Sequence, residues 1–123
     1  MTQYEDRAPA TASPLTELFS AQGRALLMPY AVGGYPDIAS CAKILRAYRE
    51  AGADLIEIGI PFSDPLADGP VIQSASTLAL SRGVRPTNVL DLAAEASSEG
   101  ARVVLLSYLN TILAYGPARM VLR

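Results

Sequence analysis

The segment Leu55-Ile-Glu-Ile-Gly-Ile60 is an apolar run that contains a single glutamate, and it leads directly into Pro61-Phe-Ser-Asp-Pro-Leu-Ala-Asp-Gly-Pro70. Its β-branched residues favour a strand, whereas the prolines and the glycine that follow favour a loop. Strand side chains alternate between two faces, so the three isoleucines face one way and Glu57 faces the other. If the isoleucines pack on helices, Glu57 lies on the opposite side, which in a barrel is the interior.

The residues on either side of this segment predict an alternation of helices and strands. Apolar spacing and turn residues indicate further strands over 25–32 and 102–108, and helices over 14–22, 38–51, 71–81, 86–98 and, in its first turns, 116–123. Ser13 and Asp37 are the expected N-caps, and Gly52 is expected at a helix C-terminus. The strands are apolar on both faces, which favours parallel βα units.

Composition excludes several classes of function. Half of the residues are hydrophobic and the formal net charge is -2 without a basic stretch, so we expect no nucleic-acid and no membrane partner. The amino-terminal residues lack the pattern of a secretory signal, which predicts a cytoplasmic protein. Histidine is absent and Cys41 is the only cysteine, so no metal site is expected and acid–base chemistry falls to carboxylates, tyrosines or lysine.

Three carboxylates are candidates for chemistry. A buried carboxylate such as Glu57 is costly, and such groups are common among catalytic acids and bases. The alternative is a structural glutamate that pairs with an arginine or lysine. Asp64 and Asp68 follow the strand, at the end where parallel sheets bind ligands, but Asp before Pro or Gly is also ordinary turn chemistry.

Two tyrosines lie near the ends of the other predicted strands. Tyr30 and Tyr108, together with Met28 and Leu106, could face the same side as Glu57. An aromatic-lined pocket beside two acids suits a flat apolar ligand. The alternative is that these side chains only form core.

The run from Ile56 to Pro70, followed by Val71-Ile72-Gln73, resembles the signature of the tryptophan synthase alpha chain. Supporting matches lie at 34–37, 51–54, 83–84 and 115–116, and the resemblance covers about residues 15–118. It implies an α/β fold: an incomplete (β/α)8 TIM barrel with the first three to four βα units and an N-terminal helix. Residues 1–13 would then form a flexible tail and residues 14–123 a partial barrel domain.

The resemblance also implies an activity and a site. The family cleaves indole-3-glycerol phosphate to indole and glyceraldehyde 3-phosphate in tryptophan biosynthesis. Glu57 matches the catalytic glutamate, which moves protons at indole C3 and at the glycerol hydroxyl. Asp68 matches the aspartate that binds the indole N–H. Tyr30 falls where the family has an aromatic wall, usually Phe, and further substrate-binding positions fall on Ile72, Leu106 and Tyr108.

The same resemblance implies a partner. The loop from Pro61 to Gly69 resembles the segment that faces the beta subunit, which carries pyridoxal phosphate, so no cofactor is expected in this chain. The family usually has Pro where Thr111 stands, which is expected to alter the turn after the third strand. The family's phosphate site follows its seventh and eighth strands, so we expect this chain by itself to be inactive or very weak.

Two alternatives to an active lyase remain open. The chain could be a catalytically impaired binding partner of the beta subunit. It could instead belong to another phosphate-sugar barrel, such as a histidine-pathway isomerase, which the segment Pro61–Pro70 argues against. Three strands would leave an unpaired sheet edge and an uncovered face, which predicts oligomerisation or association with a second half.

Overall fold

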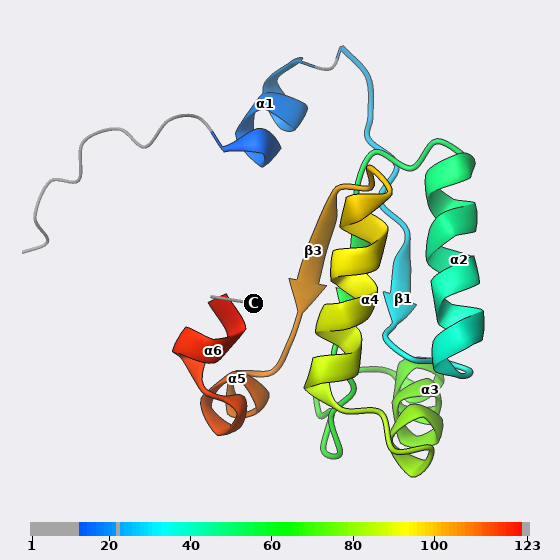
Figure 1. Cartoon of the computed structure of the whole chain (residues 1–123), viewed down its shortest axis with the longest axis vertical. Helices are drawn as coiled ribbons and strands as arrows, with labels where there is room; N and C mark the ends of the chain where they lie inside the picture. Colours follow the sequence, from blue (N-terminus) through cyan, green and yellow to red (C-terminus); the bar gives the residue numbers. More distant parts are fainter. Residues whose placement is uncertain (1–12, 22, 122–123) are drawn as a thin grey trace, which may run out of the picture.

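A computed structural model of the chain describes residues 13–21 and 23–121. Three parallel strands, β1 (Tyr30–Val32), β2 (Ile56–Gly59) and β3 (Val103–Leu106), form one sheet in the order β1-β2-β3 (Figure 1). The helices of this part of the chain are α1 (Pro14–Ala21), α2 (Ile38–Glu50), α3 (Pro70–Ser81), α4 (Pro86–Ser98), α5 (Leu109–Tyr115) and α6 (Pro117–Val121). The parallel βα alternation predicted from the sequence is confirmed.

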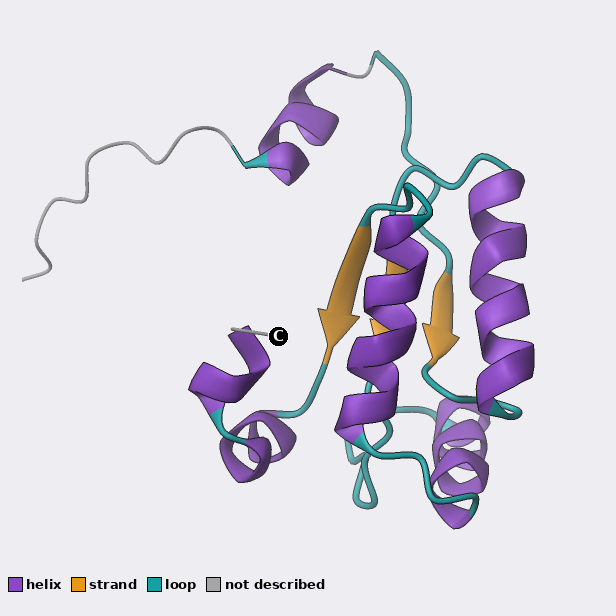
Figure 2. Ribbon diagram, viewed as in Figure 1, coloured by secondary structure: helices purple, strands orange, loops and turns teal. Residues whose placement is uncertain are grey.

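Two helices cover one face of the sheet. α2 and α4 lie side by side over the strands, whereas α3 and α5 lie at the carboxyl ends (Figures 1 and 2). The isoleucines of β2 and of the residue after it are buried in the main core, as their alternation predicts. They pack there with Cys41 and Leu45 of α2 and with apolar side chains of α4. Cys41 is therefore a packing residue, and Glu57 is left to the opposite face.

The first strand is shorter than predicted. We expected a strand over 25–32, but β1 begins only at Tyr30. Pro29 has no N–H, so the segment before Tyr30 cannot complete a ladder. It still runs along β2, because the carbonyl of Leu27 accepts the Asp54 amide at 2.9 Å and that of Pro29 accepts the Glu57 amide at 3.0 Å.

The third strand is also shorter than predicted, and one helix was not predicted. β3 ends at Leu106 instead of residue 108, and α5 begins two residues after Ser107. Tyr108 caps α5 without a side-chain hydrogen bond, so the usual Ser, Thr, Asp or Asn signal is missing. Gly116, at φ 101°, ends α5 and separates it from α6, which overlaps the predicted helix over 116–123. Residues 1–12 of the expected tail, and positions 22 and 122–123 of the expected helices, lie outside the described residues.

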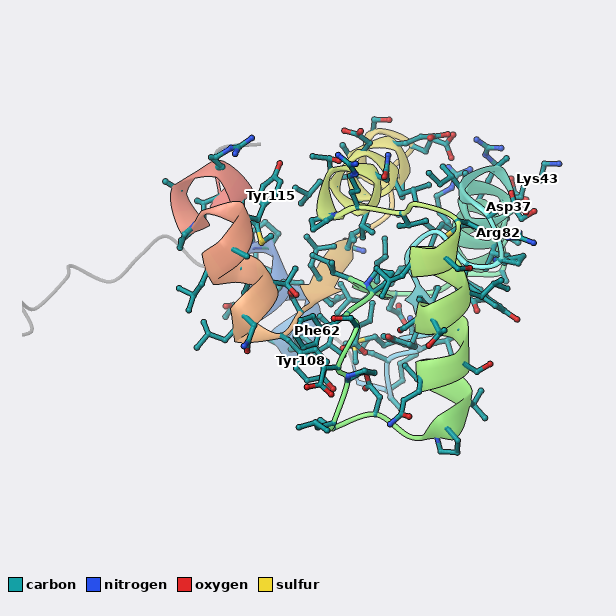
Figure 3. All side chains as sticks on the ribbon, turned by 90° about the horizontal axis from the view of Figure 1, so that it is seen from below. Asp37, Lys43, Phe62, Arg82, Tyr108 and Tyr115 are labelled. Atoms are coloured by element: carbon teal, nitrogen blue, oxygen red, sulfur yellow. The ribbon has the colours of Figure 1, made fainter. Side chains whose placement is uncertain are left out.

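Predicted caps fix the helix ends. The Ser13 hydroxyl accepts the Thr16 amide at 3.2 Å, and Asp37 accepts the Ser40 amide at 2.8 Å. Gly52 follows α2 with φ 90°, a conformation in which a Cβ is strained. Arg82, just after α3, donates to the Pro36 carbonyl at 2.6 Å, which connects the end of α3 to the start of α2 (Figure 3).

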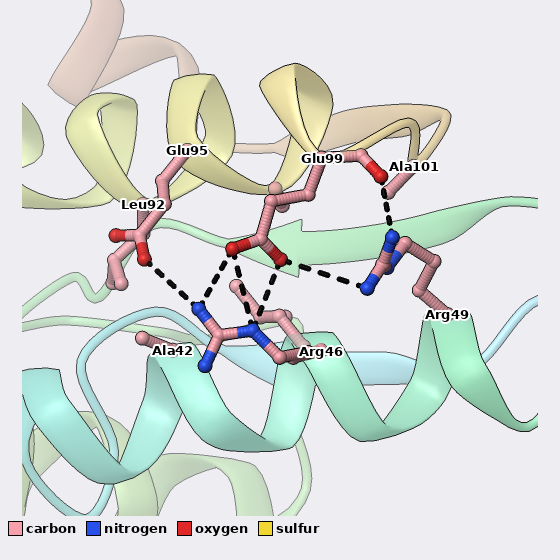
Figure 4. A pocket seen from close by; sticks show the side chains of 9 residues that line it. Ala42, Arg46, Arg49, Leu92, Glu95, Glu99 and Ala101 are labelled. Atoms are coloured by element: carbon pink, nitrogen blue, oxygen red, sulfur yellow. Dashed lines mark hydrogen bonds and ion pairs between the residues drawn. The ribbon is translucent and has the colours of Figure 1, made fainter.

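Charged side chains tie α2 to α4. Arg46 donates to the Glu99 carboxylate from Nε at 3.1 Å and from Nη2 at 2.7 Å, and Nη2 also lies 3.4 Å from Glu95 (Figure 4). Arg49 donates to the Glu99 carbonyl at 2.5 Å. A bidentate arginine fixes orientation as well as distance, so this cluster sets how the two helices lie against each other.

A second ion pair sets the amino end of the sheet. Arg24 forms a bidentate contact with Asp54, at 2.6 and 2.9 Å, and the same carboxylate accepts the Leu27 amide at 2.8 Å. These bonds hold the approach to β1 against the start of β2. Within residues 13–21 and 23–121, no helix has the length and apolar character needed to cross a membrane.

Candidate active site

The candidate site lies on the face of the sheet opposite α2 and α4. Tyr30 of β1 pairs in register with Glu57 of β2, and Gly59 pairs with Leu106 of β3. Residues paired across parallel strands present their side chains on the same face. The register therefore brings together three of the predicted site residues that come from three separate strands.

Glu57 is partly buried on this face of β2. None of the residues that the structure describes forms a hydrogen bond or an ion pair with its carboxylate. The structural alternative, a glutamate paired with an arginine or lysine, has no partner among them. Glu57 instead lies within electrostatic range of Tyr30.

The loop after β2 brings Asp68 back toward the strands. The Asp68 amide donates to the Pro65 carbonyl at 3.0 Å, and its own carbonyl accepts the Gln73 side chain at 2.8 Å. These bonds form a compact turn before α3. Asp64, in contrast, is exposed and is not among the residues that line the cleft described below.

Tyr108 connects this loop to β3. Its hydroxyl donates to Asp68 Oδ2 at 3.3 Å and accepts the Ala67 amide at 2.9 Å. Its ring stacks on Phe62 with 5.0 Å between ring centroids, and the two side chains lie together in Figure 3. The loop position therefore depends on an aromatic pair that the sequence predicted only in part, since Phe62 was not singled out.

A cleft opens between these groups. It has a volume of about 180 Å³ and is lined mainly by apolar surface with a few polar groups, which come from Tyr30, Gly59, Ile60, Ala67, Asp68, Ser76, Leu106, Ser107 and Tyr108. Four of the six predicted site residues line it. Glu57 does not line the cleft, but it is the register neighbour of Tyr30, which does. Ile72 does not line the cleft either and packs against the hydrophobic core.

Some lining residues were not predicted as site residues. Gly59 follows from the same alternation as Glu57, so it had a signal in the sequence, whereas Ser107 falls on the opposite face of the predicted strand and had none. Ser76 is buried on α3 and carried none. A mostly apolar cleft with a few convergent polar groups is the usual form of a small-molecule site.

The charges of the site act on Tyr30. Burial raises the pKa of the Tyr30 phenol, and the nearby charges of Asp68 and Glu57 raise it further. The phenol is therefore neutral near pH 7 and keeps its hydrogen. Among the described residues, no group of three or more His, Cys, Asp or Glu side chains is placed to hold a metal ion.

Thr111 stands in the first turn of α5. Its amide donates to the Tyr108 carbonyl at 3.1 Å, a bond that proline cannot make. The substitution expected to alter the turn after β3 therefore adds a backbone bond there. Its buried hydroxyl has no hydrogen-bond partner in the part of the chain that the structure describes.

Parallel strands that alternate with helices and carry their polar site at the carboxyl ends are typical of (β/α)8-barrel proteins. The three strands form an incomplete barrel of this class. Comparison with known proteins narrows the class further. The family model for the tryptophan synthase alpha chain matches residues 17–123, and the chain belongs to this family.

Similar proteins agree with this assignment. The chain is 49% identical over 102 residues to the tryptophan synthase alpha chain of Microcystis aeruginosa. The matched region covers 80% of this chain and 39% of the relative. It is 39% identical over 112 residues to the tryptophan synthase alpha chain of Mycobacterium ulcerans, and the matched region covers 91% of this chain and 42% of that relative. The chain thus spans about two fifths of the length of these curated relatives.

Solved structures show the same fold. Tryptophan synthase from M. tuberculosis, in an open form with BRD0059 bound, superposes with a TM-score of 0.83 at 40% identity, over 87% of this chain and 44% of that one. Tryptophan synthase subunit alpha from Legionella pneumophila gives 0.78 at 35% identity, over 85% and 40%.

Proposed function

We propose that the chain supplies the two catalytic carboxylates and the aromatic wall of an active site that cleaves indole-3-glycerol phosphate to indole and glyceraldehyde 3-phosphate. One observation carries the proposal. Asp68 lines a cleft at the carboxyl ends of the strands, and Glu57 stands on the same face without a salt bridge to any described residue. Family membership supports the reaction class.

The two carboxylates would have different tasks because their surroundings differ. Glu57, which has no hydrogen-bond partner among the described residues, is suited to proton transfer. It would deliver a proton to indole C3 and take the proton of the glycerol hydroxyl as the carbon–carbon bond breaks and its electrons return to the ring. Asp68, held by Tyr108, would accept the indole N–H and stabilise the positive charge of the protonated ring.

The remaining predicted residues would form the walls. Tyr30, Leu106 and Tyr108 line the cleft and would contact the flat ring. Ile72 would act through the position of α3, because it packs against the core. A cytoplasmic location is part of the proposal, since the family's reaction belongs to amino-acid biosynthesis.

The test is indole release by the purified chain. We expect weak turnover that falls by about 100-fold or more in Glu57→Gln, the range for loss of a general acid–base group. Glu50→Gln, at an exposed position on α2, is the matched control and should keep the wild-type rate. A Glu57→Gln variant as active as the control would contradict the catalytic proposal, whereas a chain that releases no indole would favour the docking function described next.

A second candidate is that the chain docks on a beta subunit without catalysis. The exposure of apolar side chains around the loop favours it, because Leu66 is 85% and Val71 79% exposed. Pyridoxal phosphate would then belong to the beta subunit. Co-purification with a beta subunit, lost in Leu66→Ser but kept in Glu50→Gln, would support this function, and no complex at micromolar concentration would exclude it.

A further inference from the structure

The Tyr30 phenol crosses from β1 to β2. Its hydroxyl lies directly over the backbone of Gly59, where a Cβ would overlap the Tyr30 oxygen and crowd the ring carbon that bears it at 2.8 Å. Glycine leaves room for the phenol there, whereas a side chain would force the phenol to shift. The hydroxyl therefore lies against the Gly59 backbone in the cleft wall.

At that point the hydroxyl has no acceptor among the residues that the structure describes. No residue within 13–21 and 23–121 forms a hydrogen bond with it, although Tyr30 and Asp68 both line the cleft. Glu57 is the register neighbour of Tyr30, so the hydroxyl lies in the field of both carboxylates. The other cleft tyrosine, Tyr108, already uses its hydroxyl to bind Asp68 and Ala67.

The surroundings also fix the state of the group. Burial and the two negative charges raise the pKa of the phenol, so the group keeps its hydrogen and acts as a donor at neutral pH. A ligand that fills the cleft displaces water from this half-buried donor, which costs free energy unless the ligand itself supplies an acceptor. The cleft is open to a ligand, and an oxygen atom of that ligand can supply the acceptor.

We propose that the Tyr30 hydroxyl is a specificity-determining group that donates a hydrogen bond to a side-chain oxygen of the ligand. The cleft would then prefer an aromatic ring with a hydroxylated chain over the same ring with a bare alkyl chain. A purely hydrocarbon wall could not make this distinction, because it discriminates by shape alone. The inference rests on the proposed function and names the substrate feature that this site selects.

The test compares two ligands on the full chain by isothermal titration calorimetry. The first is indole-3-glycerol phosphate, which carries hydroxyl groups on the chain between the ring and the phosphate. The second is indole-3-propanol phosphate, which has the same ring and phosphate but no hydroxyl group on that chain. Tyr30→Phe should weaken binding of the first about tenfold, the size expected for one hydrogen bond, and leave the second unchanged. Tyr35→Phe, on an exposed tyrosine outside the cleft, should change neither.

The outcomes separate this inference from the proposed function. Equal losses for both ligands, or no loss for either, would overturn the role of the hydroxyl and leave the proposed function standing. A wild-type chain that binds neither ligand would overturn the proposed function.

A ligand-free measurement tests the geometry independently. The titration of Tyr30 can be followed by nuclear magnetic resonance of tyrosine labelled at Cζ. The pKa of Tyr30 should move down toward its ordinary value of 10.0 in both Asp68→Asn and Glu57→Gln. A titration that neither variant changes would overturn the placement of the hydroxyl within range of the two carboxylates.

Discussion

The hydroxyl of Tyr108 lies 3.3 Å from Oδ2 of Asp68, and this bond joins the end of β3 to the loop that follows β2. The same oxygen accepts the Ala67 amide, and the ring stacks on Phe62. A single side chain on one strand thus holds the loop of its neighbour. The position of the candidate catalytic aspartate depends on it.

Tyr108→Phe keeps the stacked ring and removes both hydrogen bonds. We expect the free energy of unfolding to fall by about 1 kcal/mol, because water replaces part of what is lost at an exposed amide. The Ala67 amide should exchange its hydrogen faster than in the wild type. Tyr35→Phe is the control, since the hydroxyl of Tyr35 has no bond to the described residues. Unchanged Ala67 exchange in Tyr108→Phe would contradict this account of the loop.

The pair of Arg24 and Asp54 predicts a pH dependence. The hydrogen bond from Arg24 lowers the pKa of Asp54 from its ordinary 3.8 to about 2. The unfolded chain therefore binds a proton before the folded chain does, so the stability from this pair is complete above pH 3.8 and is lost as the pH falls toward 2. Asp54→Asn should show a shallower decline in this interval when unfolding is measured against pH.

Other carboxylates contribute to the same slope, so the difference between variants is the test. The pKa values of Asp37 and Glu99 are also lowered, and some decline should persist in Asp54→Asn. Arg24→Gln should also give a shallower profile than the wild type, because it removes the largest of the effects that lower the pKa of Asp54, although the Leu27 amide still lowers it. Profiles that run parallel to that of the wild type would show that the pair is not formed in solution.

The cluster between α2 and α4 predicts a salt dependence. Glu99→Gln removes the charge that Arg46 and Arg49 share, which should lower the midpoint of thermal unfolding. The side chains of Arg46, Arg49 and Glu99 are all partly exposed. Screening at about 1 M salt should therefore reduce the difference in unfolding midpoint between Glu99→Gln and the wild type. Glu17→Gln on α1, whose carboxylate forms no salt bridge with the described residues, is the control. A difference that salt leaves unchanged would point to packing instead of charge.

Gly59→Ala tests the contact with the Tyr30 phenol. The new Cβ would overlap the hydroxyl and force the ring from its place, at a cost of about 1–3 kcal/mol. In a Tyr30→Ala background the same change should cost much less, because the overlapping atoms are gone. Urea unfolding of the two single variants and the double variant measures this coupling. Additive losses would show that the two positions do not touch.

Much of the fold follows from local patterns. The alternation in β2 predicted which residues face the helices, and Asp37 and Gly52 predicted both ends of α2. The errors have physical causes. Pro29 shortens the first strand by withholding a donor, and the N-cap of α5, Tyr108, offers no capping side chain.

The candidate site was predictable where strand alternation applies. Tyr30, Glu57 and Leu106 reach one face because parallel register places them there. The contacts of Phe62 and Ser76, and the turn of Ile72 toward the core, depend on how the loop and α3 pack against the sheet. Packing between elements distant in sequence has no local pattern that one sequence could show.

The space above Gly59 of β2 is filled by the Tyr30 phenol of β1, so the size of one residue limits the size of the other during evolution. With this backbone, a relative that acquires a side chain at the position of Gly59 must either displace the phenol at the position of Tyr30 or carry a smaller residue there. The two positions should therefore covary in size across an alignment, with a glycine wherever the long aromatic side chain occurs. Mutational paths that remove the ring first avoid the overlap, which adding the methyl group first creates.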